Sequence, residues 1–303
     1  MMKLIPVLLV LLLNSVITQD VSAKITGEFA ELKILRTILE RDEEQLDLAE
    51  VKLSIDKLIV SSIDVKSELT KIDRMVADVQ SMLLPESSAM KKMQAVKKYL
   101  YTPGQWNNYK AYQYDFDDPL GTKISNKLLS NYLKNKKGNC VTMPFLFIIL
   151  GERLGINVTA SVAPLHVFVM FTDTDGKSYN LETTSGANFT RDTWYRQQMP
   201  MTDQAIDNGI YLQPLTKKET IAVMMTVLAE YYFQEEEYKK SIAISDLTLK
   251  YYPKYVNSML RNGSAYYRLL QDYFLKKYPN PNNILKEQRK LFIKRQSLLV
   301  CKS

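Results

Sequence analysis

The stretch GNCVTMPFLFIILGERLG, residues 138–155, decides the architecture of this chain. Its middle part is apolar on every side, which is typical of a helix that is buried all round. Gly155 is a good helix stop and Pro144 is tolerated only in a first turn, so the helix should begin between residues 139 and 142. This places Cys140 at or beside the helix N-terminus, where the positive end of the helix dipole favours a thiolate.

Two strands joined by a tight turn are predicted after this helix. Residues 157–162 and 165–172 have the composition of strands, and the second strand carries His166. The sequence DTDG at 173–176 is a hairpin signal, and residues 177–183 are the expected return strand. The middle of the chain is therefore an apolar helix packed on a small antiparallel sheet.

The hairpin geometry selects an acidic partner for the histidine. If the loop consists of residues 174–176, His166 lies opposite Thr184 and Glu182 is its diagonal neighbour on the same face of the sheet. Diagonal neighbours have Cα atoms about 7–8 Å apart, which two long side chains can bridge. We therefore expect Glu182 to orient the imidazole, with Asp192 as the reserve acid.

These residues form a candidate catalytic triad. A thiol becomes a strong nucleophile when it loses its proton, and His166, the one histidine of the chain, is the base for Cys140. Glu182 would hold the imidazole from its other side. Two alternatives stay open: Cys140 is a small core residue, or it forms a disulfide with Cys301.

The same motifs resemble a known family. Gly138-Asn139-Cys140 before an apolar helix, the His166 strand and the segment YNLETT at 179–184 look like the transglutaminase-like core of the papain superfamily. The segment YDFDDP at 114–119 and the helical N-terminal region resemble a bacterial branch that joins this core to a tetratricopeptide tail. The resemblance covers roughly residues 40–270.

The resemblance implies chemistry on amides, either peptide hydrolysis or transamidation, with Cys140, His166 and Glu182 as the triad. The sequence departs from the family at two positions. The acid is usually aspartate, and a glycine often precedes the histidine of this branch, whereas Leu165 does so here. Some members have lost the cysteine and keep only a binding role. The alternative is therefore a catalytically silent adaptor that binds an envelope protein or peptide.

The chain should divide into four parts of an α+β protein. Residues 1–23 read as a signal peptide, 24–98 as a helical region, 99–213 as the transglutaminase-like core and 214–303 as a tetratricopeptide-like helical region. The last assignment rests on one repeat-like stretch at 220–252, and an ordinary helical hairpin is the alternative.

The N-terminus predicts export. Lys3 precedes the apolar run 4–13, and Val21-Ser22-Ala23 is a plausible cleavage site. We expect a periplasmic or secreted protein that is not an integral membrane protein after cleavage. The net charge of +7, from 40 Lys and Arg against 33 Asp and Glu, suits a solvated basic surface. Expected partners are a protein or peptide substrate and a protein bound by the C-terminal helices. No nucleic acid is expected.

The sequence implies no cofactor or metal, because it has neither a Gly-rich phosphate loop nor a cluster of metal ligands. A calcium ion in the acidic loop at 115–118 is an open but generic alternative. The oxyanion of the reaction would lie against the Cys140 backbone N–H and one upstream donor. Gln105, Gln113 and Asn131 are equal candidates for this donor.

Overall fold

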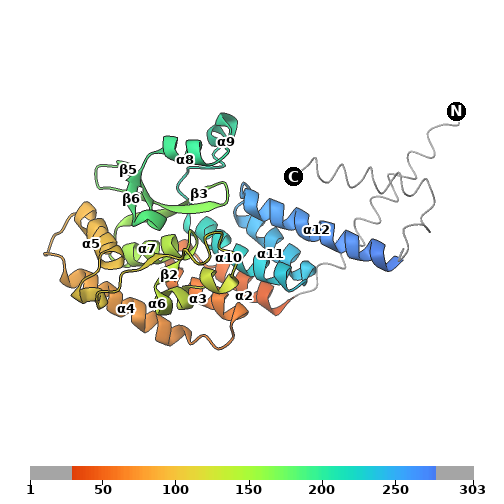
Figure 1. The fold of residues 1–303 in the computed structure, drawn as a ribbon, viewed down its shortest axis with the longest axis horizontal. Helices are drawn as coiled ribbons and strands as arrows, with labels where there is room; N and C mark the ends of the chain where they lie inside the picture. The colour runs from red at the N-terminus through yellow and green to blue at the C-terminus, as the bar shows by residue number, and fades with distance from the viewer. Residues whose placement is uncertain (1–28, 278–303) are drawn as a thin grey trace.

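The computed structural model describes residues 29–277 and confirms the α+β fold class (Figure 1). A small antiparallel sheet packs on a central helix, and further helices flank this core. The predicted signal peptide at 1–23 and Cys301 lie outside the described residues.

Four α-helices form the described part of the N-terminal helical region (Figure 1). They are α2 (Ala30–Leu39), α3 (Leu48–Ile59), α4 (Val65–Ser81) and α5 (Ala89–Tyr101). Of these, α3, α4 and α5 contact the central helix, and α2 contacts α3 and the C-terminal helix α11 (Tyr238–Tyr251). Three of the four helices begin at a polar cap. Asp47 accepts hydrogen bonds from the first backbone N–H groups of α3, and Asp64 and Ser88 cap α4 and α5 in the same way. One apolar face of each helix is buried.

The central helix α7 (Thr142–Arg153) is the helix expected from the apolar stretch. Its first ten residues are all buried, so it contacts protein on every side. Pro144 lies in the first turn, where its missing N–H costs no hydrogen bond. A Cβ atom on Gly151 would lie 2.4 Å from Val158, so the glycine lets the sheet approach this closely.

The sheet has the strand order β3-β4-β5-β6, with every pair antiparallel. Its strands are β3 (Asn157–Ala163), β4 (His166–Thr172), β5 (Ser178–Glu182) and β6 (Asn188–Thr190). In the β4–β5 hairpin Thr172 pairs with Ser178, and the next residues outward pair in step with them. Gly176 has φ +79°, so the turn has the three-residue loop and left-handed glycine that the sequence predicts.

Short elements connect the helical region to the sheet. The strands β1 (Gln113–Tyr114) and β2 (Lys137–Gly138) pair in parallel and bring the acidic loop beside the start of α7. The remaining short elements are η1 (Glu43–Gln45), η2 (Gln105–Asn107), η3 (Ile124–Lys127), α6 (Leu129–Asn135), η4 (Thr183–Ser185), α8 (Asp192–Gln198) and α9 (Asp203–Asp207).

The C-terminal helices are α10 (Lys217–Gln234), α11 (Tyr238–Tyr251) and α12 (Val256–Lys277). The segment before α10 follows the outer edge of β3, where the N–H groups of Leu212 and Leu215 donate to Val162 and Ala160 at 3.0 and 2.9 Å. This pairing covers an edge that would otherwise be open. Across residues 29–277, none of the helices combines the length and apolarity needed to cross a membrane.

A continuous apolar core runs through these parts. It includes Leu35 of α2, Phe147 of α7, Val169 of β4 and Leu228 of α10, all fully buried. The helical regions on either side therefore share their apolar packing with the sheet and α7. The limits at residues 98 and 213 remain predictions from sequence.

A buried ion pair joins α3 to the segment that leads into α6. Lys52 and Asp56, one turn apart, contact each other and are both fully buried. The ammonium group of Lys52 also donates to the Lys127 carbonyl at 2.9 Å, and Asp56 accepts the Leu129 N–H at 2.6 Å. Burial raises the pKa of Asp56, although the Lys52 charge opposes this shift. The pair therefore fixes residues 127–129 against α3.

Replacing Lys52 by Met should lower the free energy of unfolding by about 3–5 kcal/mol, because it leaves a buried carboxylate without its partner. Urea denaturation measures the loss. Lys71→Met, which removes an exposed ion pair with Glu68, is the control and should cost at most about 1 kcal/mol. Combining Lys52→Met with Asp56→Asn should restore part of the loss. A single variant as stable as the control would contradict a structural role for the pair.

Candidate active site

Cys140 lies in the turn that precedes α7. The side-chain oxygen of Asn139 accepts the N–H groups of Val141 and Thr142 at 3.0 and 3.4 Å, so the asparagine shapes this turn. A Cβ atom on Gly138 would lie 2.6 Å from the Thr142 hydroxyl, and the glycine is therefore required for this close approach. Cys140 is only partly buried, as a thiol that meets a substrate must be.

His166 is the first residue of β4 and follows a tight turn from β3. Ala163 pairs with His166, so Pro164 and Leu165 form the two-residue loop. Leu165 has φ +56°, a left-handed conformation that glycine adopts at much lower cost. This explains in physical terms why a glycine suits the position before the histidine. The Leu165 side chain is 76% exposed, at the mouth of the cavity described below.

Glu182 contacts the histidine, as the hairpin register predicts. Its Oε2 atom lies 2.7 Å from Nε2 of His166. The same carboxylate accepts the Tyr195 hydroxyl at 3.1 Å and, through Oε1, the backbone N–H and hydroxyl of Thr184 at 3.0 and 2.5 Å. Four hydrogen bonds thus hold a carboxylate that is almost completely buried. Since Nε2 is used by Glu182, Nδ1 is the nitrogen left for Cys140.

The electrostatics of the site favour an imidazolium. Burial opposes the charged form, but hydrogen bonds to Cys140 and Glu182 and their negative charges outweigh burial and raise the pKa of His166 to about 9. The pKa of Glu182 is also pulled in opposite directions. Burial raises it, whereas the hydrogen bond and charge of His166 and the hydrogen bonds from Thr184 lower it, and the net shift is downward. The glutamate is therefore ionised when it meets the imidazole.

Other residues singled out from the sequence lie away from the thiol. Asp192 accepts the Asn180 side chain at 2.5 Å and is thus engaged outside the His166 contact. None of the three suggested oxyanion donors, Gln105, Gln113 and Asn131, belongs to the cavity that contains Cys140. The structure therefore supports none of them in this role.

The acidic loop forms its own hydrogen-bond network. Asp118 accepts the N–H groups of Thr122 and Lys123 at 2.9 and 3.1 Å, and Asn126 bridges it to Asp115. Burial opposes ionisation of Asp118, but these bonds outweigh it and lower its pKa to about 2. Over residues 29–277, no three His, Cys, Asp or Glu side chains are grouped as a metal site would require. The network instead folds the loop back beside Cys140.

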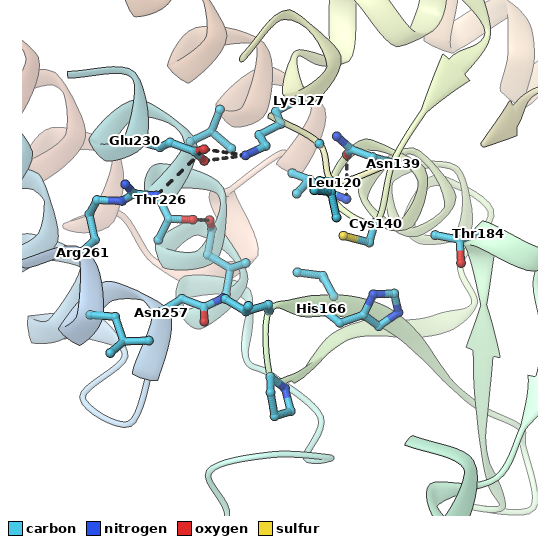
Figure 2. A pocket seen from close by; sticks show the side chains of 18 of the residues that line it. Leu120, Lys127, Asn139, Cys140, His166, Thr184, Thr226, Glu230, Asn257 and Arg261 are labelled. Carbon is cyan, nitrogen blue, oxygen red and sulfur yellow. Dashed lines mark hydrogen bonds and ion pairs between the residues drawn. The ribbon is translucent and has the colours of Figure 1, made fainter. Parts of the chain in front are cut away.

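Cys140 and His166 both project into a cavity of about 810 Å³ (Figure 2). Apolar side chains form its mouth, including the exposed Phe116 and Leu120 of the acidic loop. The opposite wall belongs to the C-terminal helices and carries Glu230 of α10 and Arg261 of α12 (Figure 2). This volume is in the range of small-molecule and peptide sites.

Sequence reasoning did not find Tyr195 or the charged wall. Tyr195 lies on α8 and reaches Glu182 from a short helix that has no periodic signal. Lys127, Glu230 and Arg261 come from three distant segments, and no local pattern relates them. A map of residue pairs that vary together would be the signal able to find such a wall.

The comparisons with known proteins agree with this geometry. The model of the transglutaminase-like superfamily matches residues 66–240, which include Cys140, His166 and Glu182. The chain belongs to this superfamily. It is also similar to UPF0162 protein BU173 of Buchnera aphidicola subsp. Acyrthosiphon pisum, with 22% identity over 236 residues, which cover 75% of this chain and 82% of that protein. The transglutaminase-like core that the sequence motifs predict is thereby confirmed.

The raised pKa of His166 makes the stability of the protein depend on pH. Between the ordinary value of 6.5 and the folded value of about 9, the folded protein keeps a proton that the unfolded chain releases. The free energy of unfolding should therefore fall as the pH rises through this window, by at most about 1.4 kcal/mol per pH unit. Below the window both states are protonated and the contribution is fully present.

Urea denaturation at a series of pH values measures this slope, and His166→Gln is the matched variant without the titrating group. The difference in slope between the two proteins reports His166 together with Cys140 and Glu182, whose titration is coupled to that of the histidine. Equal slopes would show that the histidine has an ordinary pKa in the folded protein.

Proposed function

We propose that this protein is an exported thiol enzyme that acts on an amide bond of a protein or peptide. The proposal rests on the 2.7 Å contact between His166 and Glu182 at a cavity that also receives the Cys140 side chain. A nucleophile, a base and an orienting acid are the three roles that acyl transfer through a thiol requires. Membership of the transglutaminase-like superfamily supports the same chemistry.

The proposed reaction begins when Nδ1 of His166 takes the proton of the Cys140 thiol. The thiolate attacks the amide carbonyl carbon, and a C–S bond forms as the carbonyl oxygen becomes an oxyanion near the Cys140 backbone N–H. The imidazolium then gives its proton to the amide nitrogen, the C–N bond breaks, and the amine leaves a thioester on Cys140.

The second half of the reaction releases the acyl group. A water molecule attacks the thioester and gives a carboxylic acid, or an amine attacks and gives a new amide. In both cases His166 accepts the proton of the attacking group, and the C–S bond breaks to return the thiolate. Glu182 stays ionised throughout and holds the imidazole through Nε2. Its charge matters because a neutral acid would stabilise the imidazolium less.

The pairing is tested by the rate at which iodoacetamide alkylates Cys140 in the Cys301→Ser background. At pH 7 the rate should fall by about tenfold or more in His166→Ala, because the thiolate loses its imidazolium partner. Glu182→Gln, which keeps the size of the side chain and removes its charge, should give an intermediate rate. Mass spectrometry of the alkylated peptide assigns the reaction to Cys140.

A slow rate that is unchanged by His166→Ala would overturn the enzyme proposal. The alternative of a silent adaptor would then explain the cavity better, with binding of an envelope protein or peptide as its role. Tyr195→Phe removes one hydrogen bond to Glu182 and leaves the ring in place. It therefore separates the effect of losing a bond to the glutamate from the effect of losing packing around it.

The proposed location rests on the N-terminal sequence. Residues 1–23 combine Lys3, the apolar run 4–13 and small residues before the cleavage site. Expressed at full length in a bacterium, the protein should be recovered from the envelope fraction or the medium with Lys24 as its first residue. Intact-mass measurement and N-terminal sequencing detect this. A chain that retains residues 1–23 would contradict export by cleavage.

We further propose that α10, α11 and α12 are a tetratricopeptide-like unit that binds a protein partner. The support is the close packing of α10 and α11, in which the hydroxyl of Ser241 donates to the Ala229 carbonyl at 2.8 Å. Both residues are small and buried, at positions where the repeat pattern requires small residues. The helices also complete the wall of the cavity, so a bound partner would lie next to the proposed site.

A further inference from the structure

The cavity wall that faces Cys140 carries a group of charged side chains from α10, α12 and η3 (Figure 2). Lys127 binds both carboxylate oxygens of Glu230, at 2.7 and 2.6 Å. Their side chains are 12% and 18% exposed, so the pair is largely shielded from solvent. Lys127 therefore neutralises Glu230, and the two together present little net charge to the cavity.

Arg261 is the surplus charge of this wall. Its guanidinium forms a long ion pair with Glu230, at 3.9 Å and beyond hydrogen-bond distance, and lies over the Phe233 ring at 4.9 Å from the centroid. Within the part of the chain that the structure describes, no hydrogen bond is formed by this guanidinium. The ring contact holds the side chain in place, while its planar set of N–H donors stays available.

The remaining described lining of the cavity offers no second carboxylate to match this charge. Glu230 is the one carboxylate among the described lining residues, and it already has Lys127. His166 adds a positive charge on the other side of the cavity when it is protonated. Between these ends the apolar Val223, Val227 and Leu260 lie beside polar side chains such as Thr226 and Asn257. The cavity thus has a partly apolar middle and a net positive charge on the wall that faces the thiol.

We infer that the substrate is a peptide-like amide that carries a carboxylate, which Arg261 binds while the reactive carbonyl lies at Cys140. This inference rests on the proposed function and names its substrate class. A guanidinium binds a carboxylate through two parallel hydrogen bonds, which gives both affinity and orientation. The apolar middle would hold the atoms that connect the carboxylate to the reactive amide.

The buried pair of α3 supports this arrangement. Lys52 holds the carbonyl of Lys127, so the residue that neutralises Glu230 has a fixed backbone. Lys127 already neutralises Glu230, so the long ion pair between Arg261 and the same carboxylate leaves one positive charge in the wall. Lys127 therefore keeps both oxygens of Glu230 hydrogen-bonded, and the N–H groups of Arg261 can donate to a substrate.

The test compares thiol-directed probes that differ only in charge. The probes are iodoacetyl peptides of two and of four glycine residues, each made with a free C-terminal carboxylate and with a C-terminal amide. A third type carries a glutamate side chain and a C-terminal amide, so that a main-chain and a side-chain carboxylate are distinguished. The protein is the full chain with Cys301→Ser, and the rate of alkylation of Cys140 is measured at low salt.

At least one carboxylate probe should react about five- to tenfold faster than its amide counterpart, with the preference shrinking in high salt. Arg261→Gln should remove the preference, so that each carboxylate probe reacts at the rate of its amide counterpart. Arg268→Gln removes the same charge from an exposed position of the same helix, outside the cavity, and should keep the preference. Equal rates for all probes, or a preference that survives Arg261→Gln, would overturn the inference.

The failure of the proposed function gives a different result. A Cys140 that reacts slowly and without dependence on His166 contradicts the enzyme, whereas fast and equal reaction with all probes contradicts only the carboxylate site. If no probe reacts, calorimetry on Cys140→Ala with the acetylated carboxylate and amide peptides decides the matter. Preferential binding of the carboxylate peptide that Arg261→Gln abolishes supports the inference, and any other result overturns it.

Discussion

The buried ion pair of Lys52 and Asp56 is the constraint on which the active-site half of the molecule depends. Two charges removed from water are tolerated only when each finds partners, and here those partners include the Lys127 carbonyl and the Leu129 N–H. The pair therefore determines where the chain runs between η3 and α6. That segment supports the cavity wall through Lys127 and leads through α6 and β2 to the turn that carries Cys140.

The parts of the site that depend on local rules could be predicted from the sequence. The DTDG turn fixes the register of β4 and β5, and this register brings Glu182 to His166. Pro144 limits where α7 can begin, and so places Cys140 just before it. In each case the decisive information lies within a few residues of the side chain concerned, where backbone geometry leaves few choices.

Long-range packing is the part that the sequence did not disclose. Tyr195 reaches Glu182 because α8 folds across the end of the sheet, and Arg261 reaches the cavity because α12 packs beside α10. Neither contact follows from spacing or propensity. The suggested oxyanion donors, Gln105, Gln113 and Asn131, precede the cysteine in the chain but are not among the residues that line the cavity. Nearness in sequence therefore does not predict which side chains line the cavity when helices lie between them.

The order of the groups along the chain has a consequence for biosynthesis. Cys140, His166 and Glu182 lie on elements that are complete before α10 begins, and their contacts span short loops, which form early in folding. Arg261 belongs to the last described helix and joins the site only when α12 docks. Under the proposed function, the triad residues thus precede Arg261 in the order of synthesis. The group that would react and the group that would select the ligand therefore lie on parts of the chain that are made at different times.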